Sequence, residues 1–271
     1  MELVSDEELE KGLIAAGNSL LRPPSSVKEL IHLLDQIEQL LSKVCQSPST
    51  AILAALSPVS KALAAKELLK HSDADVKVGV GCCFSELIRI TAPEAPEDDE
   101  TMKDVFELIV SCFENLWDVS SRWYGKRGSM LESMANVRSF LIMLDIHCET
   151  MIVEMFKHFL KVDRHYDERM FESMEIVMTL VLEEIDDSSK DVLNPILATL
   201  KRENEAHHFM TTISSTLAER VIQNSVEKIT PYLAKAVKSL DASFYDFGEV
   251  VASVCAQEDP GSVTDEDTPI L

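Results

Sequence analysis

The sequence predicts an all-α protein built as a solenoid of antiparallel helix pairs. Only 8 glycines and 10 prolines occur in 271 residues, a composition poor in turn formers and well suited to helices. Apolar residues recur at steps of three and four along most of the chain, whereas strand-like alternation is rare. Similar segments also return at a nearly regular interval. Together these observations favour helices that stack in repeated pairs.

A succession of amphipathic helices is expected after residues 1–26, which form an N-terminal lead that is either helical or flexible. In each expected helix, apolar residues three and four apart line one face. Pro195 and Pro231 are each expected to start a helix or to kink one. The expected helices cover residues 27–44, 105–116, 130–144, 151–160, 171–181, 192–200, 209–221, 226–237 and 244–254.

The interval between these helices indicates a repeat. Equivalent helices begin near Val105, Met151 and Val192, which lie 46 and then 41 residues apart. This spacing falls in the range of about 40–47 residues that is typical of HEAT repeats. Short polar breaks punctuate the pairs at residues 94–101, 120–128, 163–168 and 184–190.

The segment that begins at Asp73 matches the HEAT pattern best. An acidic turn leads into Val76 and Lys77, and an apolar helix follows. We therefore expect a HEAT-type solenoid over residues 27–255, with an ordinary all-α globule as the alternative. Residues 256–271 hold five acidic residues, two prolines and no base, so they are expected to form an acidic, disordered tail.

The net charge limits the partners that the chain can have. The 25 lysines and arginines stand against 47 acidic residues, which gives a formal charge of −22. A surface this negative repels phosphate, so direct sequence-specific binding of nucleic acid and binding to anionic membranes are both disfavoured. The N-terminus has no basic region followed by an apolar stretch, and no secretory signal is expected.

The sequence predicts neither an enzyme nor a metal or cofactor site. Phosphate-loop, dinucleotide-binding, nucleophile-elbow and zinc-protease motifs are all missing. His147 and Cys148 are adjacent on a helix and point in different directions, which rarely suits one ion. Six cysteines without CxxC spacing are expected to be reduced core residues, with no disulfide framework.

Two stretches differ from the expected solenoid. Residues 122–127 (Arg-Trp-Tyr-Gly-Lys-Arg) mix aromatic and basic residues, a weak nucleic-acid signal that we interpret as a solvated loop with Trp123 or Tyr124 against a neighbouring helix. In residues 91–100, Pro93 and Pro96 bar a helix and are followed by four acids. Two prolines fix the backbone, so this corner is ordered before a peptide arrives.

The same corner carries a resemblance to a known family. Residues 87–96 read Leu-Ile-Arg-Ile-Thr-Ala-Pro-Glu-Ala-Pro. They are followed by the four acidic residues 97–100 and then by residues 102–109 (Met-Lys-Asp-Val-Phe-Glu-Leu-Ile). This segment resembles the amino-terminal region of the cohesin regulators called precocious dissociation of sisters protein five. The likeness covers roughly residues 27–237, and residues 191–200 (Asp-Val-Leu-Asn-Pro-Ile-Leu-Ala-Thr-Leu) make it similar to the plant form.

The resemblance implies a nuclear, chromatin-associated HEAT scaffold without catalysis and without a cofactor. It implies roles in sister chromatid cohesion, chromosome segregation in mitosis and DNA repair, with the kleisin subunit of cohesin and the wings-apart-like release factor as partners. A helical-repeat scaffold that no longer binds cohesin is the alternative. The residues expected to bind partner motifs are Arg89, Ala92, Pro93, Glu94, Ala95 and Pro96.

Two departures from the family pattern affect this expectation. Family members usually carry a tyrosine after the second proline, whereas this chain has Glu97. The wall and the charge of the partner pocket are therefore expected to differ. Full members of the family are also several times longer, so this chain resembles only their beginning.

Overall fold

The computed structural model describes residues 5–161, 167–186, 190–201, 213–240 and 242–256. All regular structure in these ranges is helical. The helices are α1 (Asp6–Leu20), α2 (Val27–Leu41), α3 (Thr50–Leu63), α4 (Lys66–Leu69), α5 (Ala74–Thr91), α6 (Asp99–Phe113), α7 (Tyr124–Val137), α8 (Phe140–Asp145), α9 (Glu149–Leu160), α10 (Glu168–Glu184), η1 (Lys190–Val192), α11 (Leu193–Leu200), α12 (Ile213–Asn224), α13 (Val226–Ser239), η3 (Phe244–Phe247) and α14 (Glu249–Ala256).

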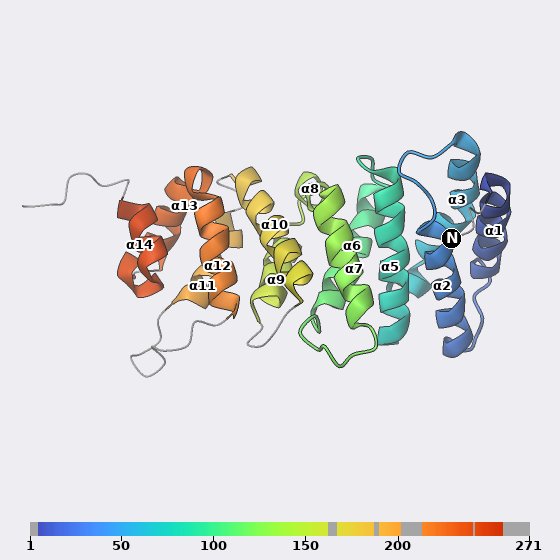
Figure 1. Cartoon of the computed structure of the whole chain (residues 1–271), viewed down its shortest axis with the longest axis horizontal. Helices are drawn as coiled ribbons and strands as arrows, with labels where there is room; N and C mark the ends of the chain where they lie inside the picture. The colour runs from blue at the N-terminus through green and yellow to red at the C-terminus, as the bar shows by residue number, and fades with distance from the viewer. Residues whose placement is uncertain (1–4, 162–166, 187–189, 202–212, 241, 257–271) are drawn as a thin grey trace, which may run out of the picture. The chain divides into compact units, whose positions relative to one another are not determined.

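The chain divides into two compact units. The first holds residues 1–159 and 166–177, and the second holds residues 160–165 and 178–271. In the first unit, α1 packs on α3 and α2, α2 packs on α5, and α5 packs on α6 and α7. Figure 1 shows these helices side by side. The lead that was expected to be helical or flexible thus contains α1, whose Leu13 is fully buried.

Side-chain caps explain where several helices begin. Ser5 and Glu8 form a capping box at the start of α1, and the Asp73 carboxylate accepts from the amides of Asp75 and Val76 at the start of α5. Such caps satisfy amide groups that have no partner within the helix. The acidic turn that the HEAT pattern predicts at Asp73 is therefore the N-terminal cap of α5.

Hydrogen bonds between stacked helices repeat at a nearly constant separation in sequence. The Cys83 thiol lies 3.5 Å from the Leu34 carbonyl, 49 residues away, and the Gln46 amide donates to the Ala92 carbonyl, 46 residues away. In the second unit, the Ser225 hydroxyl approaches the Thr179 carbonyl, again 46 residues away. Segments about 46–49 residues apart in the sequence are thus in contact, as in stacked helix pairs.

One expected helix, over residues 130–144, is wrong. Helix α7 ends at Val137 because Arg138 adopts a left-handed conformation with φ of 55°, and α8 begins at Phe140. The break changes which residues face the core. Phe140 and Met143 are fully buried, whereas Leu141 and Leu144, which continue the apolar stripe of α7 in the sequence, are partly exposed.

Other helix boundaries also differ from those expected from the sequence. The break expected at residues 120–128 lies earlier, at residues 114–123, because α6 ends at Phe113 and α7 begins at Tyr124. The helix expected over 244–254 is divided at Gly248, whose φ of 94° suits glycine and separates η3 from α14. The acidic tail lies outside the described residues from 257 onward, as do residues 209–212 of another expected helix.

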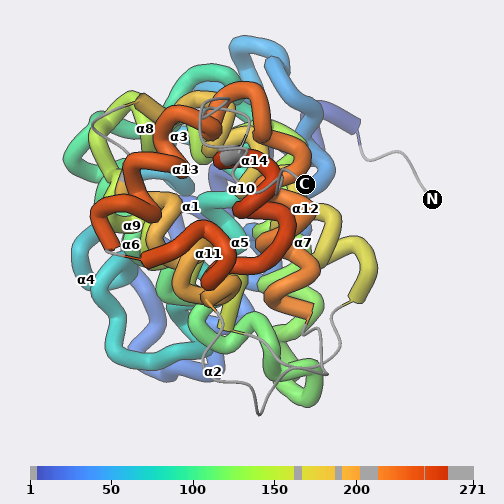
Figure 2. Tube along the Cα trace, turned by 90° about the vertical axis from the view of Figure 1, so that its left-hand side faces the viewer, coloured from blue at the N-terminus to red at the C-terminus, as the bar shows by residue number. Residues whose placement is uncertain are grey.

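The second unit packs its helices around a small core of its own. Helix α11 contacts α12 and α13, and α14 contacts α12 and α13; the Cα trace of these helices can be followed by their labels in Figure 2. Pro195 lies in the first turn of α11, where the missing amide hydrogen costs little. Pro231 lies inside α13 instead of starting it.

Burial governs the chemistry of the cysteines. No disulfide joins them, and all except Cys45 are buried. Burial raises the pKa of the Cys112 thiol to about 11 and raises the pKa of Cys82 and Cys83 further above the ordinary value. The five buried thiols are core residues, as the sequence predicted, whereas the same prediction is wrong for Cys45, which is exposed. None of the described helices has the length and apolarity to span a bilayer.

Candidate functional site

The corner between α5 and α6 is fixed at both ends. The Thr91 hydroxyl donates to the Glu94 carbonyl at 2.9 Å, and the Glu94 amide donates to the Thr91 carbonyl at 3.0 Å. At the other end, the Asp98 carboxylate caps α6 by accepting from the Thr101 amide at 2.9 Å. This hydrogen bond lowers the pKa of Asp98. The peptide bond that precedes Pro93 is cis.

The loop after α2 also holds the corner. The side chain of Gln46 donates to the Ala92 carbonyl at 3.0 Å, and the Ser47 amide donates to the Ile90 carbonyl at 3.1 Å. Ala92 is buried, whereas Pro93, Glu94 and Ala95 are exposed. The corner is therefore a rigid projection whose base is bonded to the preceding repeat.

Arg89 has a different place from the one expected of a partner-binding residue. Its Nη2 donates to the Leu41 carbonyl at 3.1 Å and to the Val44 carbonyl at 2.8 Å. Its Nε donates to Glu86 at 2.8 Å. These carbonyls lie at the C-terminal end of α2, where backbone acceptors lack partners within the helix. Arg89 thus joins α5 to α2, and its Nε and Nη2 groups donate to acceptors inside the fold.

A groove of about 410 Å³ lies beside the corner, between α3 and α5. Of the six residues expected to bind partner motifs, only Pro96 lines it. The apolar part of its lining is Leu53, Leu56, Ala64, Leu87 and Pro96, and the polar part is Ser57, Ser60, Lys61, Thr91 and Glu97. Leu53 is 44% exposed, so an apolar side chain from a partner would cover surface that now faces water.

Glu97 gives this groove its acidic group. Its carboxylate accepts a hydrogen bond from the Ser60 hydroxyl of α3, which ties the corner to the opposite wall. The change in the wall of the pocket that is expected at this position is therefore a carboxylate that is held in place. An apolar floor with one fixed acid can bind a short peptide through burial and charge, and it contains no group arranged for catalysis.

The residues on α3 were not predicted as part of the site. A signal for this helix is present, because Ser49 caps α3 through the Ile52 amide and the buried residues Ile52, Leu56, Val59 and Leu63 recur at steps of three and four. The position of Pro58 inside the helix obscures that pattern. The wall of the groove opposite the corner thus comes from α3, whose Ser60 lies 37 residues before Glu97.

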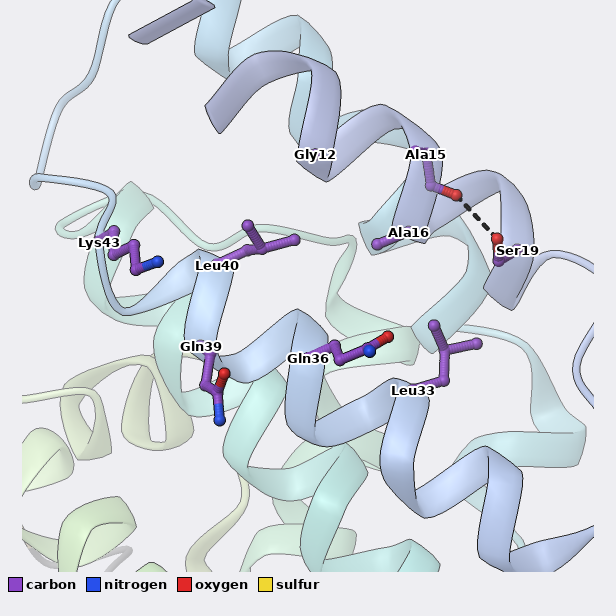
Figure 3. Close-up of a pocket in the computed structure, with 9 residues that line it drawn as sticks. All are labelled: Gly12, Ala15, Ala16, Ser19, Leu33, Gln36, Gln39, Leu40 and Lys43. Atoms are coloured by element: carbon purple, nitrogen blue, oxygen red, sulfur yellow. Dashed lines mark hydrogen bonds between the residues drawn. The ribbon is translucent and has the colours of Figure 1, made fainter. Parts of the chain in front are cut away.

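A second groove of about 420 Å³ lies between α1 and α2. Figure 3 shows Ala16 and Ser19 of α1 facing Leu33, Gln36 and Leu40 of α2. The dashed line is the hydrogen bond from the Ser19 hydroxyl to the Ala15 carbonyl, at 2.9 Å. This groove contains neither a carboxylate nor any of the residues expected from the sequence.

The basic stretch at residues 122–127 is not a solvated loop. Lys126 lies on α7 and its ammonium group donates to Asp35 at 2.6 Å and also to Glu38, both on α2. Desolvation lowers the pKa of Lys126, but the hydrogen bonds that it donates to these carboxylates raise the pKa above the ordinary value. Arg122 and the Trp123 indole both bind Asp75 of α5, so Trp123 does lie against a neighbouring helix.

The described part of the chain holds no group of three or more side chains placed to bind a metal ion. His147 is exposed and Cys148 is buried, so the two side chains do not share a site. The candidate site is therefore the groove lined by α3, α5 and residues 96–97.

Comparisons with known proteins agree with this fold. The family model "Sister chromatid cohesion protein PDS5 protein" matches residues 28–240. The Arabidopsis thaliana protein "Sister chromatid cohesion protein PDS5 homolog C" is 48% identical over 252 residues, which are 93% of this chain and 28% of that protein. Homolog D from the same plant is 41% identical, over 93% of this chain and 30% of its own length.

The likeness extends to a fungal relative and to a solved structure. "Sister chromatid cohesion protein PDS5" of Saccharomyces cerevisiae is 27% identical over 63% of this chain and 13% of its own length. A solved structure of the Pds5–Scc1 complex matches with a TM-score of 0.71 at 22% identity, over 89% of this chain and 38% of that one. The predicted HEAT-type all-α fold is thereby confirmed, and the chain spans less than a third of the length of these curated relatives.

Proposed function

We propose that this chain, which belongs to the PDS5 family of sister chromatid cohesion proteins, is a non-enzymatic scaffold that associates with cohesin in the nucleus. The observation that carries the proposal is the groove beside Pro96 and Glu97. A fixed corner loses little entropy when a peptide binds, because its backbone is already ordered. The groove therefore suits a short motif from a cohesin regulator.

The proposed partners are the kleisin subunit of cohesin and the wings-apart-like release factor. The solved relative is a complex of Pds5 with Scc1, which supports a kleisin contact for the family fold. Roles in chromosome segregation and in DNA repair would follow from that association. A scaffold that binds other peptides and no longer binds cohesin is the second candidate, supported by Glu97 in place of the aromatic residue usual in the family.

A pull-down from nuclear extract tests the proposal. The purified chain serves as bait beside Leu53→Glu, which places a charge on the exposed wall of the groove, and Ile14→Glu, which does the same on α1. Leu53 and Ile14 are exposed to similar degrees, 44% and 38%, so the two variants cost the fold about equally. We expect the native chain and Ile14→Glu to recover cohesin subunits and Leu53→Glu to lose them.

The other outcomes are equally informative. Recovery by all three baits would remove the groove from the proposal while keeping the association with cohesin. Recovery by none of them, with helix content intact by circular dichroism, would favour the second candidate. The double variant Pro93→Leu with Pro96→Leu adds a test of the corner itself, because loss of helix content there would assign it a structural role only.

A further inference from the structure

The loop between α6 and α7 contains a serine, Ser121, whose hydroxyl oxygen accepts two hydrogen bonds. Ser121 is half-buried and lies three residues before α7 begins. Its Oγ accepts from Nη1 of Arg127 at 3.1 Å and from the Trp123 amide at 3.3 Å. The N-terminus of α7 adds the partial positive charge of the helix dipole. The local environment of this hydroxyl therefore favours negative charge.

Arg127 is buried without a counter-ion. It is 7% exposed, its Nη1 also reaches the Asn115 carbonyl at 3.5 Å, and its Nε has no hydrogen-bond acceptor. No ion pair joins it to a carboxylate in the described ranges. A guanidinium group stays charged in proteins, and a buried charge is costly unless an opposite charge accompanies it.

The neighbouring charges do not fill this role. Asp75 on α5 pairs with Arg122, and Asp35 and Glu38 on α2 pair with Lys126. Asp118, in the same loop, accepts from the Ser120 hydroxyl at 2.6 Å and from the Ser120 amide at 3.1 Å. The hydrogen bond from Ser120 lowers the pKa of Asp118, and the charge of Arg127 has a smaller effect in the same direction.

We propose that Ser121 is a phosphorylation site, and that its phosphate provides the counter-ion that the buried Arg127 lacks. A protein kinase with ATP supplies the reaction. The Ser121 Oγ forms a bond to the γ-phosphorus, the bond from that phosphorus to the β–γ bridging oxygen breaks, ADP leaves, and the hydroxyl proton passes to the base of the kinase. The loop is accessible, since Ser120 is exposed and Val119 is 61% exposed.

Phosphorylation here would order the loop instead of disrupting it. A phosphate at a helix N-terminus and opposite an arginine gains charge-assisted hydrogen bonds. The adjacent Ser120 offers a matched control, because its hydroxyl is bonded to the Asp118 carboxylate and a phosphate there would meet like charge. The Ser121 amide also donates to Asp118, but the Ser121 hydroxyl contacts Arg127, and this contact is what distinguishes the two positions.

The test uses the full chain carrying phosphoserine at position 121, at position 120 or at neither. We expect phosphoserine at 121 to raise the thermal midpoint by about 2–4 °C over the unmodified chain, and phosphoserine at 120 to leave it unchanged or lower it. The ³¹P resonance of phosphoserine 121 should titrate about one unit below the ordinary second pKa of about 6. Equal midpoints and equal titrations at the two positions would overturn the proposal.

Two further experiments test whether Arg127 causes the rise in the thermal midpoint and whether the phosphate must be covalently attached. Arg127→Gln should abolish the gain at position 121; if that variant does not fold, the ³¹P titration in the chain with Arg127 decides. Inorganic phosphate added to the unmodified chain should not reproduce the gain, and if it does, the position binds free oxyanions and the modification proposal fails. In protein isolated from cells, the tryptic peptide of residues 104–122 should carry phosphate on Ser121; phosphate on Ser120 alone contradicts the proposal.

Discussion

At the scale of single residues, close packing decides which changes the molecule tolerates. A Cβ atom at Gly17 would lie 2.7 Å from the Val59 amide nitrogen and 2.8 Å from the Cβ of Pro58. A Cβ at Gly12, on the same helix, would meet only the Leu40 side chain, at 3.2 Å. The first contact involves backbone that cannot move without shifting α3. The second involves the end of a flexible side chain.

Gly17→Ala is therefore expected to lower the free energy of unfolding by about 1–3 kcal/mol, because α1 must move away from α3. Gly12→Ala should leave stability unchanged or raise it by up to about 1 kcal/mol, since alanine favours the helix. Urea denaturation followed by circular dichroism measures both. Equal effects of the two substitutions would contradict the close approach of α1 and α3.

The thiols give a second prediction at this scale. Cys45 is the exposed cysteine, and the other five are buried. In the native chain, N-ethylmaleimide should add once and rapidly, at Cys45, because the other thiols are buried. All six should react after denaturation. Mass spectrometry counts the adducts, and Cys45→Ser, which should show no rapid adduct, is the control.

Burial of these thiols also makes stability depend on pH. The folded pKa of Cys112 is about 11, above that of an unfolded thiol, so the unfolded chain releases this proton first as pH rises. The stabilising effect is complete below the unfolded pKa and is lost as pH rises from about 9 to about 11. Denaturation at a series of pH values measures the decline, and Cys112→Ala should make it shallower.

At the scale of the elements, Arg89 shows what the sequence could and could not predict. Its place at the end of an amphipathic helix was evident from the periodicity, and the corner that follows was evident from two prolines. That its guanidinium group binds the C-terminal carbonyls of α2 could not be predicted, because the contact spans 45–48 residues. The groove beside the corner was missed for the same reason, since α3 supplies its other wall.

The division between α7 and α8 has a similar explanation. Met130, Met134, Leu141 and Leu144 continue one apolar stripe in the sequence, so local pattern favours one long helix. The structure instead buries Phe140 and Met143, and the left-handed Arg138 changes the phase between the two segments. Phe140, the larger aromatic side chain, is thus buried in the core by tertiary packing. The local sequence pattern contains no signal that predicts this burial.

Arg89→Met should reduce the free energy of unfolding by about 1.5–3 kcal/mol, because two carbonyls at the end of α2 lose a charged donor. Methionine keeps the helix propensity and the length of the side chain. Arg22→Met, at an exposed position, is the control and should change stability little. If Arg89→Met were as stable as the native chain and instead lost its partners, Arg89 would be a binding residue after all.

At the scale of the whole chain, the charge of −22 outweighs every local basic group. In the basic stretch that gave a weak nucleic-acid signal, Arg122 pairs with a carboxylate on α5, Lys126 pairs with two carboxylates on α2, and Arg127 is buried. Those lysine and arginine side chains are therefore not available to neutralise phosphates. The proposed association with cohesin is therefore expected to pass through protein contacts.

This chain should accordingly leave duplex DNA unshifted in a gel at micromolar concentration and about 0.15 M salt. Binding that weakens steeply with added salt would contradict the prediction. The variant Asp75→Asn, which removes the partner of Arg122 and Trp123, should not create such binding, because the net charge hardly changes. A DNA shift with this variant alone would show that the ion pairs mask a basic surface.

The contact of Trp123 with Asp75 has a consequence for spectroscopy. The chain has two tryptophans, and Trp117 is 48% exposed, whereas the indole of Trp123 joins α7 to α5 and lies near the charged groups of Arg122 and Lys126. Once Trp117 is replaced by phenylalanine, the intrinsic fluorescence of the chain reports a single junction between two repeats. The emission maximum would then follow the separation of α5 from α7, whether heat, denaturant or a bound partner causes it, without any added label.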